Sequence, residues 1–312
     1  MSHSHDHALD ARLGRDRRRL VAALVLVAGL MALEIAGGVV AHSLALLADA
    51  GHMLGDAVSL ALALVAAWLA AKPAGGRWTF GLGRTEVLAA QVNGIALLLV
   101  GVWIVYGAVR RLVSPHDVDG GLVAVVALAG VAINVGAAAL LASPSRQSMN
   151  VRAAFVHVAS DVAAFAGTAA AGLVILATGW NRVDPIVSLA VAALILVTAE
   201  RLLRESTAVL LESAPGDMDP ELVGRAIVGE EHVVEAHDLH VWAVTSGFPA
   251  LSAHVLVEPG EDCHAVRRSI ERMLAERFGL THTTLQVDHV SAPARPVELG
   301  GRLGRLHAPR RG

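Results

Sequence analysis

The chain is poor in cysteine, in aromatic residues and in charge. Of its 312 residues one is Cys, aromatic residues amount to 4% and charged residues to 17%. A single Cys excludes an intramolecular disulfide framework. The formal net charge of −3, with no domain-wide basic surface, argues against a nucleic-acid-binding protein. Because ordinary soluble domains carry about 25% charged residues, the composition already lies outside their range.

A protease motif is also missing. An intramembrane metalloprotease needs a general base beside its metal ligands, as in His-Glu-x-x-His, where the Glu activates water. The chain has no such sequence. We therefore expect that the protein is not an enzyme.

Apolar residues are abundant and lie in long runs. Hydrophobic residues make up 54% of the chain, and the mean hydropathy is +0.57. A membrane-spanning helix needs about 20 predominantly apolar residues. Six runs reach that length: 20–40, 44–71, 86–109, 121–142, 153–178 and 183–203. The first run exceeds the 7–15 apolar residues typical of a signal peptide. The pattern predicts a bundle of six transmembrane helices.

The distribution of Lys and Arg predicts the orientation. Ten of these residues fall before the first run and in the joints after the second and fourth, whereas the opposite side has only Arg110, Arg111 and Arg182. Short loops rich in Lys and Arg stay in the cytoplasm. With six spans, both termini are expected on the cytoplasmic side of a bacterial cell membrane.

The chain becomes polar after Arg204. A short helix is expected at 219–228, strands at 233–244 and 250–257, a second helix at 261–278 and a last strand at 283–290. This order, α-β-β-α-β, predicts a small ferredoxin-like α+β domain. We divide the chain into a His- and Arg-rich segment (1–19), a membrane domain (20–208), a cytosolic domain (209–290) and a tail expected to be disordered (291–312).

Two of the apolar runs contain a His–Asp pair. His52 and Asp56 lie four positions apart in the second run, and His157 and Asp161 have the same spacing in the fifth. Four positions on a 3.6-residue helix place each pair on one face. Two such helices facing each other would present two imidazoles and two carboxylates, which suits tetrahedral Zn²⁺. A single pair could equally be a hydrogen bond between helices, but two pairs favour a metal site.

Other polar residues also lie inside the apolar runs. Asp49 lies on the same stripe as His52 and is a further candidate ligand, with a proton acceptor and a helix-packing group as alternatives. Glu34 is a candidate proton-pathway residue or a structural hydrogen-bond partner. Asn93 and Asn134 are typical of contacts between membrane helices. The carboxylates of Asp49 and Asp56 alone would cost about 5–7 kcal/mol to insert, so they need partners or a wet cavity.

Four segments carry a resemblance to a known family. Ser43 to Asp56, Thr79 to Ala90, His157 to Asp161 and His237 to Trp242 resemble, in order, motifs of the cation diffusion facilitator family in its zinc-transporting branch. The resemblance implies a homodimer that exports Zn²⁺ from the cytoplasm in exchange for protons. His rather than Asp in the second-run pair favours Zn²⁺ over Mn²⁺ or Fe²⁺ in that family.

The resemblance also implies roles for particular residues. His52, Asp56, His157 and Asp161 would form the transport site. Arg84 would pair with an acidic residue after the sixth run, here Glu212, and lock the dimer. Some relatives hold a second metal in the loop between the second and third runs, with His and Asp ligands. The loop from Lys72 to Arg84 has neither residue type, so that site is expected to be absent.

In the cytosolic domain the family's metal ligands correspond to His237, His254, His264 and Asp288. Gln286 stands where some relatives have His, so we expect one regulatory Zn²⁺ and not a binuclear site. Since side chains alternate along a strand, His237 and His240 are expected on opposite faces. Cys263 could add a soft ligand.

Three functional alternatives remain open from the sequence. The short tract with His3, His5 and His7 could capture metal weakly. The tetrad could serve a zinc sensor or scaffold that binds the metal without moving it. Imidazole and carboxylate ligands also suit Cd²⁺, Co²⁺ and Ni²⁺.

Overall fold

The computed structural model describes residues 28–141, 149–245, 247–290 and 306–307, and for 137–160 and 306–307 it describes no side chains. The chain divides into two compact units. The first contains residues up to Leu60 and Asn93–Arg201, and the second contains Ala61–Val92 and the residues from Leu202 onward. The predicted boundary at 208/209 would leave Ala61–Val92 and residues 202–208 with the membrane helices, whereas here they belong to the second unit. That boundary stays a prediction.

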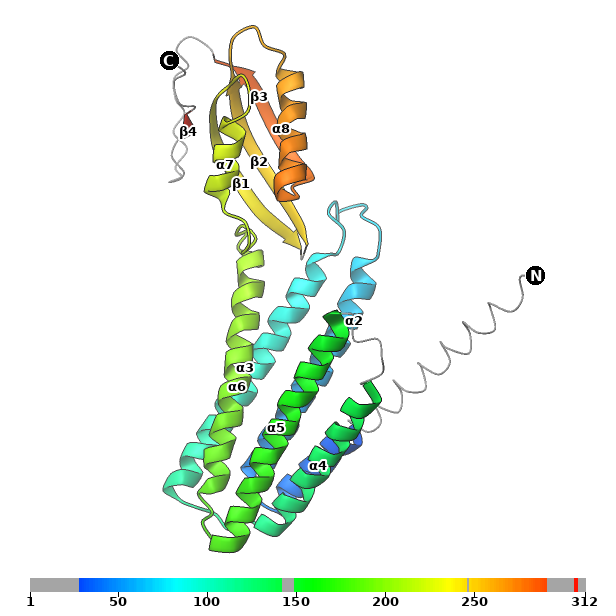
Figure 1. Cartoon of the computed structure of the whole chain (residues 1–312), viewed down its shortest axis with the longest axis vertical. Helices are drawn as coiled ribbons and strands as arrows, with labels where there is room; N and C mark the ends of the chain where they lie inside the picture. Colours follow the sequence, from blue (N-terminus) through cyan, green and yellow to red (C-terminus); the bar gives the residue numbers. More distant parts are fainter. Residues whose placement is uncertain (1–27, 142–148, 246, 291–305, 308–312) are drawn as a thin grey trace, which may run out of the picture. The chain divides into compact units, whose positions relative to one another are not determined.

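Apolar helices make up the membrane region (Figure 1). After a helical segment at Ala28–Val40 come five helices: α2 (Leu44–Ala70), α3 (Arg84–Val113), α4 (Gly120–Leu141), α5 (Met149–Thr178) and α6 (Val183–Leu210). Among the described residues, four helices are long and apolar enough to cross a membrane, in α2, α3, α5 and α6. In the other two helices the apolar stretches with described side chains, Ala28–Val40 and Gly120–Gly136, are shorter, so the count of six spans stays a prediction.

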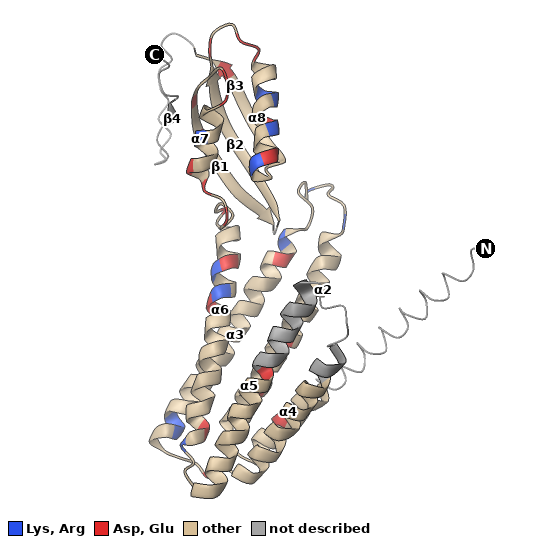
Figure 2. Ribbon diagram, in the orientation of Figure 1, with Lys and Arg blue, Asp and Glu red and all other residues tan. Residues whose placement is uncertain are grey.

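The membrane helices keep apolar side chains on their outside. Leu60, Leu64, Leu99 and Val197 are all more than half exposed, as expected of residues that face lipid. Figure 2 shows long stretches of these helices without a charged residue, whereas α8 and the loops around the sheet carry many. The surface of the helices therefore suits a bilayer.

Two glycines let α4 and α5 approach closely. A Cβ atom on Gly172 would lie 2.6 Å from the backbone nitrogen of Ala124, and one on Gly120 would lie 2.6 Å from the carbonyl oxygen of Gly172. Neither backbone atom can move aside. Small residues at contacts of this kind are typical of membrane helix pairs.

The second unit contains a four-stranded sheet. Its elements are α7 (Pro220–Val228), β1 (Val233–Thr245), β2 (Phe248–Val257), α8 (Cys263–Phe278), β3 (His282–His289) and β4 (Leu306–His307). The strand order is β3-β2-β1-β4, with β1 antiparallel to β2 and β2 parallel to β3. The predicted α-β-β-α-β order is confirmed. The structure adds β4, from the tail expected to be disordered, and the rest of that tail lies outside the described residues.

Capping residues set the helix starts in this unit. Asp219 accepts a hydrogen bond from Glu221 N and is followed by Pro220, a favourable first residue. Asp262 accepts from the backbone nitrogens of His264 and Ala265, which lowers the pKa of its carboxyl. Both helices pack with the sheet around one apolar core that includes Ile227, Val255 and Ile270.

Candidate metal sites

The predicted transport ligands lie in the first unit. In α2, His52 Nε2 is 3.7 Å from Asp56 Oδ2, and both side chains are partly exposed. Asp161 is partly buried on α5, and His157 precedes it by about one turn, with a side chain outside the described residues. In the described part of the chain, His52, Asp56 and Asp161 do not bring three ligand atoms within 4.8 Å of one another. The geometry of the complete tetrad therefore stays a prediction.

Two buried acids adjoin the pair on α2. Glu34 is fully buried and Asp49 is 2% exposed, which is rare for carboxyl groups in a membrane helix. Among the described residues, no donor reaches either Glu34 carboxyl oxygen or Asp49 Oδ2. Asp49 interacts electrostatically with Glu34, His52 and Asp161. The two carboxyls can hydrogen-bond each other only when one holds a proton, so this place suits a proton or a cation.

The two buried asparagines differ in their contacts. Asn93 Nδ2 on α3 donates to Ser59 Oγ on α2 at 2.5 Å, a link between helices as the sequence indicates. Asn134 Nδ2 donates to Gly130 O within α4, at 3.1 Å. The bond of Asn134 therefore lies within one helix and does not link two helices.

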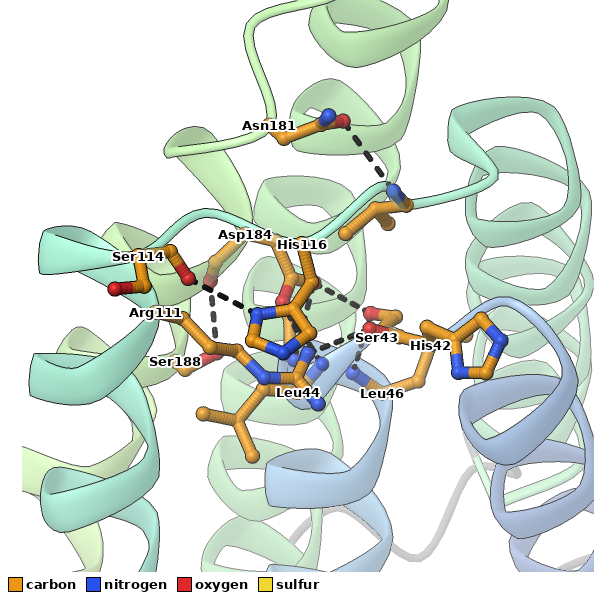
Figure 3. A network of polar contacts seen from close by, with 12 residues as sticks. His42, Ser43, Leu44, Leu46, Arg111, Ser114, His116, Asn181, Asp184 and Ser188 are labelled. Atoms are coloured by element: carbon orange, nitrogen blue, oxygen red, sulfur yellow. Dashed lines mark hydrogen bonds and ion pairs between the residues drawn. The ribbon is translucent and has the colours of Figure 1, made fainter.

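A network that the sequence analysis did not anticipate surrounds the start of α2 (Figure 3). Asp184, in the first turn of α6 and 1% exposed, accepts hydrogen bonds from Ser43 Oγ (2.5 Å), Leu44 N (2.8 Å) and Ala45 N (3.2 Å). Arg111 Nη1, near the end of α3, lies 3.5 Å from its Oδ2. The α6 carboxylate thus caps the N-terminus of α2. In the sequence, this cap is indicated only by the position of Asp184 at the start of an apolar run.

Arg84 and Glu212 are paired within one chain. Arg84 Nη2 lies 3.3 Å from Glu212 Oε1, and its Nε donates to Val244 O at 3.1 Å. Thr245 Oγ1 also donates to Gly83 O, at 2.9 Å. These contacts join the start of α3 to the end of α6 and to β1. Any effect on a dimer stays a prediction.

A bulge in β1 overturns the expected directions of His237 and His240. His237 pairs with His254 and His240 with Ser252, so three steps on β1 match two on β2. The extra residue lies between them, where Asp238 has a positive φ of 52°. Because residues 252 and 254 share a face of β2, His237 and His240 also share one. The expectation of opposite faces is therefore wrong, since strict alternation fails at a bulge.

The predicted cytosolic ligands are spread over four elements, β1, β2, α8 and β3. The rings of His237 and His254 lie 5.5 Å apart, centroid to centroid. Gln286 is the β3 neighbour of His254 and donates to Asp288 Oδ2 at 2.8 Å, and His264 lies in the first turn of α8. In the described residues these side chains do not form a group of three within ligand distance. Of the four predicted ligands, His237 and His254 are the two whose rings lie next to each other.

One group of three ligands does converge among the described residues. It consists of His232, Glu258 and Glu261, at one end of the β1–β2 hairpin. These three residues are not among the ligands predicted from the sequence. Two of them could have been predicted to be neighbours. His232 directly precedes the first strand of the hairpin and Glu258 directly follows the second, and residues that flank paired strand ends lie close together.

Comparisons with known proteins agree along nearly the whole chain. The family model described as the cation efflux transmembrane domain matches residues 20–211, and that of the cation efflux protein cytoplasmic domain matches 215–290. Zinc transporter ZitB of Escherichia coli is 40% identical over 293 residues, 93% of each chain. The cadmium, cobalt and zinc/H(+)-K(+) antiporter of Bacillus subtilis is 36% identical over 293 residues, 92% of each chain. The solved metal-bound C-terminal domain of the CzcD transporter from Cupriavidus metallidurans is 35% identical, covers 22% of this chain and 97% of that one, and has a TM-score of 0.22.

Proposed function

The chain belongs to the cation efflux family, whose members are transporters and not enzymes, and we propose that it exports Zn²⁺ from the cytoplasm in exchange for protons. The names of its relatives support metal efflux, with zinc common to ZitB and to the antiporter of Bacillus subtilis. The latter name also includes protons as an exchanged ion. Cd²⁺ and Co²⁺ suit the same ligands and are further candidate substrates.

The observation that carries the proposal is the pair on α2. His52 and Asp56 face the same side of an apolar helix at 3.7 Å, where no isolated charge would be stable. We assign the transport site to His52, Asp56, His157 and Asp161. Two imidazoles and two carboxylates bind Zn²⁺ tetrahedrally at about 2.0–2.2 Å. Asp49 is assigned as a neighbour of this set that can act as an additional ligand.

Exchange with protons follows from the same ligands. Zn²⁺ binds only deprotonated imidazole and carboxylate, so metal loading from the cytoplasm releases protons and reprotonation from outside releases the metal. A midplane site that is open to one side at a time then couples the two fluxes. The buried carboxyls of Glu34 and Asp49 lie where a proton can be held beside the metal ligands.

The remaining assignments concern the cytosolic side. We propose a homodimer, consistent with a cytoplasmic-domain family that is named for a dimer, with the Arg84–Glu212 pair holding the dimer in place. His237 and His254, with His264 and Asp288, would bind one regulatory Zn²⁺. Both chain termini would lie in the cytoplasm, and the domain boundary would fall at 208/209.

Zinc flux into proteoliposomes under an imposed pH gradient tests the proposal. Asp161→Ala should abolish gradient-driven uptake, whereas Glu200→Ala should leave it unchanged. Glu200 is the matched control, because its carboxylate also lies on a membrane helix but is exposed, without a partner among the described residues. Uptake that survives Asp161→Ala would place the site elsewhere. Zinc binding without uptake in the parent would favour a sensor or scaffold.

A further inference from the structure

Three ligand-bearing side chains meet at the end of the β1–β2 hairpin that is far from its turn. His232 directly precedes β1, Glu258 directly follows β2, and Glu261 lies in the loop before α8. Backbone hydrogen bonds hold this end together: Glu258 N donates to His232 O at 3.1 Å, and Glu261 N donates to Glu258 O at 3.4 Å. The side chains therefore project from a fixed backbone.

The distances between the ligand atoms are those of a metal shell. His232 Nδ1 lies 3.5 Å from Glu258 Oε2 and 3.4 Å from Glu261 Oε1, and all three ligand atoms lie within 4.8 Å of one another. An N–H···O hydrogen bond is normally about 2.7–3.2 Å long, so both contacts are long for hydrogen bonds. Two ligands of a tetrahedral Zn²⁺, each about 2.1 Å from the ion, lie about 3.4 Å apart.

The local charge also favours a cation. Glu231 Oε1 lies 3.9 Å from His232 Nε2, so three carboxylates surround one imidazole. In the described part of the chain, the ion pairs of Glu231, Glu258 and Glu261 all go to His232, and no Lys or Arg joins them. Even a protonated His232 leaves this surface with an excess of negative charge.

We propose that His232, Glu258 and Glu261 form a second cytosolic site for a divalent cation of the zinc type, separate from the predicted ligands His237 and His254. One nitrogen and two carboxylate oxygens suit Zn²⁺, Cd²⁺ and Co²⁺. The side chains are 37%, 60% and 36% exposed, which leaves the fourth position to water. The ion would join the start of β1, the end of β2 and the loop before α8. Its binding would therefore stabilise the folded domain.

Counting bound zinc tests the site in the full-length protein in detergent. The starting protein carries Asp161→Ala, His237→Ala and His254→Ala, which remove ligands of the other proposed sites. Zinc per chain is measured by equilibrium dialysis and elemental analysis. In this background, the pair of changes Glu258→Gln and Glu261→Gln should remove one bound equivalent. Because the metal is counted with the transport site disabled, the result does not depend on whether the protein moves zinc.

Two further variants separate metal binding from simple charge balance. His232→Lys places a cation beside the carboxylates but offers no ligand at neutral pH, so it should lose the equivalent while its metal-free unfolding temperature does not fall below that of the starting protein. Glu276→Gln removes one negative charge at an exposed residue of α8, half the change of the double variant, and should keep the equivalent. The same zinc count in all variants, or a loss shared with Glu276→Gln, would overturn the proposal.

Discussion

Asp184 provides a quantitative test of how α2 is held. Asp184→Ala removes the acceptor of three hydrogen bonds from the start of α2 and the ion-pair partner of Arg111. Loss of a helix cap costs about 0.5–2 kcal/mol, and removal of one partner from a buried ion pair costs about 3–5 kcal/mol. Arg111 stays 22% exposed and keeps its bond to His42 O, so part of the second cost is relieved. We expect a loss of about 3 kcal/mol in the free energy of unfolding.

The measurement is an equilibrium unfolding titration of the purified protein in mixed detergent and dodecyl sulfate. Ser188→Ala is the control, because Ser188 Oγ donates only to the carbonyl of Asp184 within α6. Its loss should cost about 1 kcal/mol or less. Equal stabilities for Asp184→Ala and Ser188→Ala would refute the argument. A functional effect is also expected, since His52 lies eight residues, or about 12 Å, along the helix from Leu44.

Three further predictions concern packing, capping and assembly. Gly172→Leu should separate α4 from α5 and lower the unfolding temperature in detergent by several degrees, because its Cβ would strike the backbone of α4. Asp262→Asn should lower the unfolding temperature at pH 7, because the pKa of Asp262 is lowered in the folded state and its charged form therefore stabilises the fold. The parent loses this stabilisation as the pH falls through that pKa, so the difference between the two unfolding temperatures should vanish in acid. Arg84→Glu should reduce the dimer fraction in mass photometry, and adding Glu212→Arg should restore it, whereas a double variant no better than the single one would argue against the pair.

The order of elements was accessible from sequence because local patterns determine it. Helical periodicity placed His52 and Asp56 on one face of α2. The helical spacing of apolar residues placed the start of the helix predicted at 261–278 within two residues of the observed start of α8. Alternating apolar residues located β1 and β2. Each of these features depends on neighbours within a few positions, which a single sequence displays directly.

The missed features depend on contacts between distant segments. The Asp184 cap joins residues 140 positions apart, and no local pattern pairs a carboxylate on α6 with the start of α2. The bulge at Asp238 shifts His240 to the face of His237, and only the register against β2 reveals the extra residue. The convergence of Glu261 on His232 likewise requires the path of the loop before α8.

Proton movement driven by zinc tests the central claim most directly. Proteoliposomes with equal pH on both sides are given a zinc gradient, and a pH-sensitive dye reports the proton concentration in the lumen. The account predicts that zinc entry acidifies the outside and raises the lumenal pH in the parent and in Glu200→Ala, but not in Asp161→Ala. Zinc entry without any change in lumenal pH would contradict exchange with protons.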